Sequence, residues 1–64
     1  MRNMKIKHHR ERRSLKQEEL AAALSVDRSA IAKWETGVAM PTADKLPLLA
    51  KTLGCTIDEL YEGE

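Results

Sequence analysis

The sequence predicts a small all-α domain of five short helices, and three observations support this fold class. The chain has 64 residues, enough for one domain, because chains this short bury only about 60% of the surface that they expose when unfolded. Aromatic residues make up 3% of the chain and Phe is absent, a composition that is unfavourable for β-sheets. Apolar residues also recur at helical spacing between residues that are typical of helix ends. We therefore expect a single domain over residues 1–64, with residues 62–64 as an acidic tail.

The first half of the chain contains three predicted helices. Residues 4–13 form an amphipathic pattern with Ile6 as its main core residue. Ser14 and Gln17 fit an S-x-x-Q capping box, in which the serine hydroxyl accepts a hydrogen bond from a free amide at the start of a helix. Asp27 is the N-cap candidate of the third helix. The apolar positions of the second and third helices are Leu20, Ala21, Ala23, Leu24, Ala30, Ile31 and Trp34.

The second half contains two more predicted helices. Thr42 opens the fourth, and residues 56–59 form a T-x-x-E capping box for the fifth. Gly37 and Gly54 stand where a left-handed residue ends the third and fourth helices. Pro47 is late for a first-turn proline, so we expect it to cost the fourth helix one hydrogen bond without splitting it. The apolar positions are Leu46, Leu49, Ala50 and Leu53 in the fourth helix and Ile57, Leu60 and Tyr61 in the fifth.

Charge is distributed unevenly along the chain. The net charge is +1, but residues 1–16 hold seven Lys and Arg against one acidic residue, which gives +6, so residues 17–64 sum to −5. This asymmetry fits a basic end that faces phosphate, and it fits equally a solvated helix face followed by an acidic tail. Cys55 is the one cysteine, so no intramolecular disulfide can form. The sequence contains no signal-peptide core and no membrane span, and the expected location is the cytoplasm.

The span 17–37 contains two short helices joined at residues 24–27, a connection whose length is typical of a helix-turn-helix. The residues Gln17-Glu18-Glu19-Leu20-Ala21, Leu24 to Ile31, Lys33-Trp34-Glu35-Thr36-Gly37 and Pro41-Thr42, followed by Leu49 to Gly54 and Ile57 to Leu60, together resemble the lambda-repressor-like (Cro, XRE-type) DNA-binding family. The resemblance covers nearly the whole chain. It implies a compact five-helix all-α domain with a helix-turn-helix at about residues 17–36, whose third helix enters the major groove.

The resemblance places Arg28, Ser29, Ala32 and Lys33 on the groove-facing side of the third helix. These four residues share one face, opposite Ile31, and none of them is a large apolar residue. Arg28 and Lys33 could donate to guanine, and Ser29 could reach a base edge or a phosphate. The alternative is a polar face that is simply exposed to solvent, which every amphipathic helix has.

Further contacts are expected with the DNA backbone. By resemblance, Gln17 binds the sugar-phosphate backbone at the start of the second helix; its alternative role is membership of the capping box. The expected backbone-contacting residues are Lys16, Gln17, Thr36, Val38 and Lys45. The resemblance also implies an ion pair between Arg10 and Glu35 that orients the first helix against the third; the alternative is two exposed charges. Trp34 is expected to pack in the core, since single-strand binders need several aromatic side chains for stacking.

Three features depart from the family pattern. Lys16 stands where the family usually has a Ser or Thr N-cap, so the cap moves to Ser14 or is lost, at about 1 kcal/mol. Ser25 replaces the usual turn glycine, which also costs about 1 kcal/mol. The loop 37–43 contains no Lys or Arg, so the backbone amides of residues 38–40 and the Lys45 side chain are expected to meet phosphates instead.

The sequence offers no candidate for catalysis or for a cofactor. It lacks a nucleophile with a base, a carboxylate pair in a plausible cleft and a glycine-rich phosphate loop. His8 and His9 are adjacent and therefore point about 100° apart on a helix, so they are not expected to bind a metal. Cys55 is expected to be a buried apolar residue.

The predicted function is that of a sequence-specific regulator of transcription, not an enzyme, which reads double-stranded DNA with the helix 28–36. The simplest interpretation is a repressor, with activation as an open alternative. One small domain contacts one half-site, so we expect a homodimer on a pseudo-palindromic operator. Family analogy places the dimer contact at Val38, Met40, Ile57 and Tyr61. The alternative from another class is an antitoxin-like or adaptor module whose main partner is a protein, with DNA binding secondary.

Overall fold

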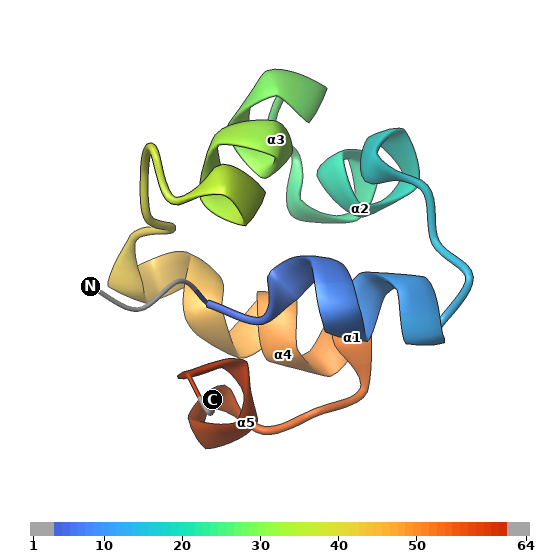
Figure 1. Cartoon of the computed structure of the whole chain (residues 1–64), viewed down its shortest axis with the longest axis vertical. Helices are drawn as coiled ribbons and strands as arrows, with labels where there is room; N and C mark the ends of the chain where they lie inside the picture. Colours follow the sequence, from blue (N-terminus) through green and yellow to red (C-terminus); the bar gives the residue numbers. More distant parts are fainter. Residues whose placement is uncertain (1–3, 62–64) are drawn as a thin grey trace.

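A computed structural model describes residues 4–61 of the chain, and Figure 1 shows the arrangement of its helices. The predicted acidic tail at residues 62–64 lies outside the described residues. The described part contains five α-helices, one short 3-10 helix (η1) and no strand. In chain order these are α1 (Ile6–Arg12), α2 (Gln17–Leu24), α3 (Arg28–Thr36), η1 (Ala43–Lys45), α4 (Leu46–Leu53) and α5 (Ile57–Tyr61). The predicted all-α fold is therefore confirmed.

The apolar faces of the helices meet in one core. In Figure 1, α2 and α3 lie together in the upper half of the molecule, and α1, α4 and α5 lie below them. The buried apolar residues are Met4, Ile6, Leu20, Ala21, Leu24, Ile31, Trp34, Leu49, Ala50, Leu53 and Leu60. Most of these positions follow the predicted helical spacing, but three of the predicted apolar positions, Ala23, Ile57 and Tyr61, are exposed. Ala23 is exposed, because it lies about 100° round the helix from Leu24 and so points away from the core.

The start of α2 differs from the prediction. Ser14 is not its N-cap; instead it takes a left-handed conformation, with φ of +57°, just after α1. Its amide donates to the Glu11 carbonyl, and the Leu15 amide donates to the Arg10 carbonyl, a pattern that closes the C-terminus of α1. The N-cap of α2 is Lys16. Its amide donates to a carboxylate oxygen of Glu19 at 2.7 Å, which supplies half of a capping box without a serine.

Pro47 also acts differently from the prediction, because the chain does divide just before it. Residues 43–45 form the separate helix η1, and α4 begins at Leu46 with Pro47 in its first turn. The first amides of an α-helix have no intrahelical acceptor, so a proline in the first turn costs the helix no hydrogen bond. The expectation of one helix running from Thr42 to Leu53 was wrong because the proline fits the start of a new helix better than the interior of a long one.

The remaining helix ends agree with the prediction in position. The Thr56 hydroxyl accepts from the Glu59 amide at 3.1 Å, and the Glu59 carboxylate accepts from the Thr56 amide at 2.8 Å, so the predicted capping box at the start of α5 is complete. Gly37 and Gly54 end α3 and α4 with φ of +83° and +72°. Asp27 stands at the N-cap of α3, although its side chain makes no capping hydrogen bond.

Ser25 ends α2 in the left-handed region, with φ of +58° and ψ of +43°. Its amide donates to the Ala22 carbonyl and the Val26 amide donates to the Ala21 carbonyl, both across the end of the helix. The turn predicted at this point therefore forms with a serine in place of glycine. The hydrogen bonds and the packing of Val26 against the core offset the backbone strain of about 1 kcal/mol.

Candidate nucleic-acid interface

Helices α2 and α3 form a corner that is fixed from inside. Ala21 and Leu24 of α2 and Ile31 of α3 are all nearly inaccessible to solvent. The small side chain of Ala21 lets the two helices approach closely, and Val26 fills the angle between them from the turn. Because α3 is held by its buried side, its outer side is presented as a rigid surface.

The outer side of α3 carries the four residues predicted to face the groove. Arg28, Ser29 and Lys33 are exposed, and Ala32 is partly exposed. Ile31 points into the core, on the other side of the helix. The stripe therefore combines two cations, one hydroxyl and one small apolar side chain. The cations and the hydroxyl can donate to acceptors on the base edges of the major groove, and the apolar side chain can contact the methyl group of thymine.

An ion pair ties the end of α3 to α1. Arg10 Nε lies 2.6 Å from Glu35 Oε2, and Arg10 Nη2 lies 3.2 Å from Glu35 Oε1, so the guanidinium donates two hydrogen bonds to the carboxylate. The two side chains are only 10% and 4% exposed. Arg10 Nη1 also donates to the Leu15 carbonyl at 2.8 Å. The hydrogen bond that Arg10 donates to Glu35, opposed by burial and assisted by the negative charge of Glu35, raises the pKa of Arg10, so the guanidinium stays charged.

Gln17 connects this ion pair to the exposed stripe. Its Nε2 donates to Glu35 Oε1 at 2.9 Å, and its Oε1 accepts from Arg28 Nη1 at 3.0 Å. Gln17 is not part of a capping box; its side chain lies between α2 and α3. Sequence reasoning missed both hydrogen bonds, because they join residues 18 and 11 positions apart and no periodic pattern predicts such a contact.

The other residues predicted to touch the DNA backbone have different surroundings. Lys16 is exposed. The Thr36 hydroxyl donates to carbonyls of its own helix at 3.1 and 3.3 Å and still has lone pairs to accept with. Lys45 Nζ lies 3.4 Å from the Leu24 carbonyl at the C-terminus of α2, a favourable place for a cation. Lys45 therefore also supports the corner between α2 and α3.

The loop after α3 does not offer the free amides that were expected of it. The Val38 amide donates to the Lys33 carbonyl at 3.0 Å and the Ala39 amide donates to the same carbonyl at 3.3 Å. These bonds satisfy the end of α3, since the last carbonyls of a helix need partners. The expectation that these amides bind phosphate was wrong for Val38 and Ala39, because the helix end uses them first.

Several exposed apolar side chains lie away from the α3 stripe. Val38 and Met40, in the loop after α3, are 74% and 51% exposed, and Ile57 and Tyr61 of α5 are 37% and 40% exposed. These are the four residues predicted for a dimer contact. Leu48 is 45% exposed and was missed, although its place off the apolar stripe of α4 could have indicated an outward direction.

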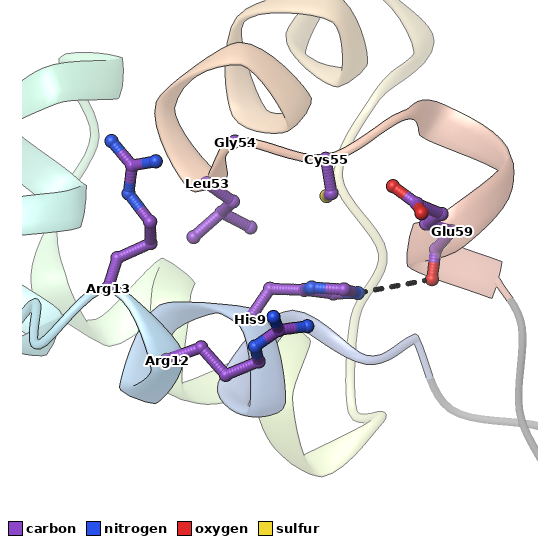
Figure 2. A pocket seen from close by; sticks show the side chains of 7 residues that line it. All are labelled: His9, Arg12, Arg13, Leu53, Gly54, Cys55 and Glu59. Carbon is purple, nitrogen blue, oxygen red and sulfur yellow. Dashed lines mark hydrogen bonds between the residues drawn. The ribbon is translucent and has the colours of Figure 1, made fainter.

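A pocket of about 270 Å³ lies between α1 and the turn that joins α4 to α5 (Figure 2). Its lining residues are His9, Arg12, Arg13, Leu53, Gly54, Cys55 and Glu59. The His9 ring hydrogen-bonds the Glu59 carbonyl at 3.3 Å, which ties α5 to α1. Cys55 is half-buried, less than expected, and burial, followed by the charge of Glu59, raises the pKa of its thiol. None of the residues predicted to contact DNA lines this pocket.

Over residues 4–61 there is no group of three or more His, Cys, Asp or Glu side chains arranged to hold a metal ion. Within the same range no helix is both long and apolar enough to span a bilayer. Trp34 is 7% exposed and belongs to the core, as predicted.

Comparison with known proteins gives consistent matches. A family model described as helix-turn-helix matches residues 6–60. The HTH-type transcriptional activator BcrR of Enterococcus faecalis is 44% identical over 62 residues, which cover 97% of this chain and 30% of that protein. The chain thus spans less than a third of the length of this curated relative.

Two solved structures share the fold. The P22 c2 repressor protein, in a complex with the synthetic operator 9T and Tl⁺, superimposes with a TM-score of 0.85 and 30% identity, over 94% of this chain and 91% of that one. A transcriptional regulator from Listeria innocua superimposes with a TM-score of 0.76 and 26% identity, over 97% of this chain and 64% of that one.

Proposed function

This chain belongs to the helix-turn-helix family, and on that premise we propose that it is a transcriptional regulator that binds double-stranded DNA and recognises its sequence. The observation that carries the proposal is the outer side of α3. Arg28, Ser29 and Lys33 are exposed together on a helix whose other side is fixed in the core. The relatives named as an activator and as a repressor bound to a synthetic operator support the same function.

In this proposal the residues divide into two groups. Arg28, Ser29, Ala32 and Lys33 contact base edges in the major groove, where the donors of Arg and Lys match the acceptors of guanine. The residues that contact the DNA backbone are Lys16, Gln17, Thr36 and Lys45. Contacts to phosphate fix the position of the protein on the duplex, and contacts to bases supply the sequence preference.

We also propose that the protein binds its operator as a homodimer. A single domain of this size reaches one half-site, and the near-neutral charge of the chain gives modest non-specific attraction. The exposed side chains of Val38, Met40 and Ile57 supply apolar surface for the contact. Selection of binding sites from random duplexes should yield a consensus with two-fold symmetry and half-site centres about one helical turn apart. A consensus without symmetry would contradict the dimer.

Repression is the proposed direction of regulation, because occupation of an operator by a small domain can block other proteins without a further contact. Activation is the alternative, and BcrR, which is named as an activator, favours it. A module that chiefly binds another protein remains the alternative from a different class. Failure of random duplexes to yield any consensus in the same selection would favour that class over a DNA-binding regulator.

Arg28→Ala tests the proposed base contact. The substitution should cost about 1 to 3 kcal/mol of binding free energy on the selected site and should relax the base preference at one position of each half-site. Fluorescence anisotropy at several salt concentrations measures the affinity for the selected site and the affinity for random duplexes. Arg12→Ala is the matched control, because it removes the same charge from an exposed position on α1. Equal losses on selected and random duplexes for Arg28→Ala would refute the role of Arg28 in reading bases.

A further inference from the structure

From the hydrogen bonds between α1, α2 and α3 we infer that Glu35 is a positioning residue for sequence recognition, acting through the Gln17 amide to orient Arg28. The inference rests on the proposed function, since it concerns how Arg28 reads a base. It assigns to the Arg10–Glu35 ion pair a role in specificity that is separate from its role in stability.

The first step is the orientation of the Gln17 amide. A carboxylate can only accept hydrogen bonds, so the Gln17 group that lies 2.9 Å from Glu35 Oε1 must be the NH₂ group. The oxygen of the amide is then turned towards Arg28, whose Nη1 donates to it at 3.0 Å. With an uncharged partner in place of Glu35, both orientations of the amide would be possible, and one of them would place an NH₂ group against the guanidinium.

The second step is the anchoring of Glu35 itself. Its side chain is 4% exposed, and its carboxylate is held by two hydrogen bonds from Arg10. A carboxylate in a buried bidentate pair has little freedom to rotate, since the two hydrogen bonds from the guanidinium fix its plane. The position of Glu35 Oε1 is therefore set by the packing of α1 against α3, and the Gln17 amide is positioned in turn.

The third step is the effect on Arg28. An exposed arginine ordinarily samples many rotamers, and ordering it on binding costs conformational entropy. The hydrogen bond to Gln17 uses one N–H of Arg28 and leaves the others to donate to a base. Gln17 also retains one N–H for a phosphate. A single amide can thus hold Arg28 in place and bind the DNA backbone, which predicts that Gln17→Ala weakens binding to all duplexes and lowers base preference as well.

The first test uses the free protein, so it does not depend on DNA binding. Glu35→Gln retains an oxygen that can accept from Arg10 and removes the charge that orients Gln17. Heteronuclear NMR of the side chains should show displaced resonances for the Gln17 amide and for the Arg28 guanidinium. Glu18→Gln is the matched control, because it removes an equal charge from the exposed surface of α2 and should leave both side chains unchanged. Unchanged Gln17 and Arg28 resonances in Glu35→Gln would overturn the inference.

The second test measures base preference. On duplexes that vary at the position read by Arg28, Glu35→Gln should lower the preference for the selected base by about threefold to tenfold, the size of one hydrogen bond. In the Gln17→Ala background the same substitution should have no further effect, because the connection to Arg28 is already absent. An equal effect of Glu35→Gln with and without Gln17 would show that Glu35 acts by another route and would contradict the inference.

A variant that fails to fold and a protein that selects no DNA sequence can both be distinguished from failure of the inference. If Glu35→Gln does not fold, Gln17→Met preserves the side-chain length and the Arg10–Glu35 pair while removing both amide hydrogen bonds, and it should give the same loss of base preference. If the unmodified protein selects no DNA sequence, the proposed function fails, and the NMR test still decides whether Glu35 orients Arg28 through Gln17.

Discussion

Leu49→Ala should lower the free energy of unfolding by about 2 to 5 kcal/mol, as expected for a fully buried leucine. Leu49 has no exposed surface and belongs to α4, which packs against α1, α2 and α5. A domain of this size has only a few kcal/mol of stability in total. We therefore expect a large unfolded fraction at room temperature, measured by urea denaturation with circular dichroism and with the fluorescence of the buried Trp34.

Leu48→Ala is the matched control for this prediction. The side chain is the same and the helix is the same, but Leu48 is 45% exposed. Its truncation should change the free energy of unfolding by no more than about 0.5 kcal/mol, as for other surface substitutions. Similar losses in the free energy of unfolding for Leu48→Ala and Leu49→Ala would mean that α4 does not bury Leu49 and expose Leu48 as the structure shows.

Most of the fold could be predicted from local features of the sequence. Helix ends depend on one or two residues, such as Gly54 or the Thr56 capping box, and their chemistry is visible in the sequence. The two errors about helix ends arose where the same residue type fits two local structures. Ser14 can cap the start of a helix or close the end of the preceding one, and Pro47 can bend a helix or begin one. Tertiary packing decides between such alternatives, and local sequence does not contain it.

The candidate site was predictable only in part. The exposed stripe on α3 follows from helical spacing, because four polar or small residues opposite Ile31 must share a face. The connection from Glu35 through Gln17 to Arg28 does not follow, since it depends on how three helices cross. Resemblance to a family indicated the pair of Arg10 with Glu35. It did not indicate that Gln17 would meet that pair and Arg28 at the same time.

The second large effect is expected for Arg10→Met, which should cost about 3 to 5 kcal/mol of stability. The methionine fills much of the space of the arginine stem but leaves the Glu35 carboxylate, whose side chain is 4% exposed in the unmodified protein, with Gln17 as its remaining donor. The Leu15 carbonyl also loses its hydrogen bond from Arg10. An uncompensated buried charge is far more costly than the pair is stabilising, because the desolvation penalty is no longer offset. Urea denaturation compared with the unmodified protein measures the loss.

The double substitution Arg10→Met with Glu35→Leu separates the contribution of the ion pair to stability from its contribution to base recognition. It removes both charges together, so no buried carboxylate is left unpaired, and replacing such a pair by apolar residues is often neutral or stabilising. We expect the double variant to recover most of the stability that the single variant loses, which a double-mutant cycle quantifies. The same variant should bind DNA with weakened base preference, since Gln17 and Arg28 lose their anchor. Recovery of stability without recovery of base preference would identify a pair retained for recognition, whereas a single substitution that costs under about 1 kcal/mol would identify an ordinary surface ion pair.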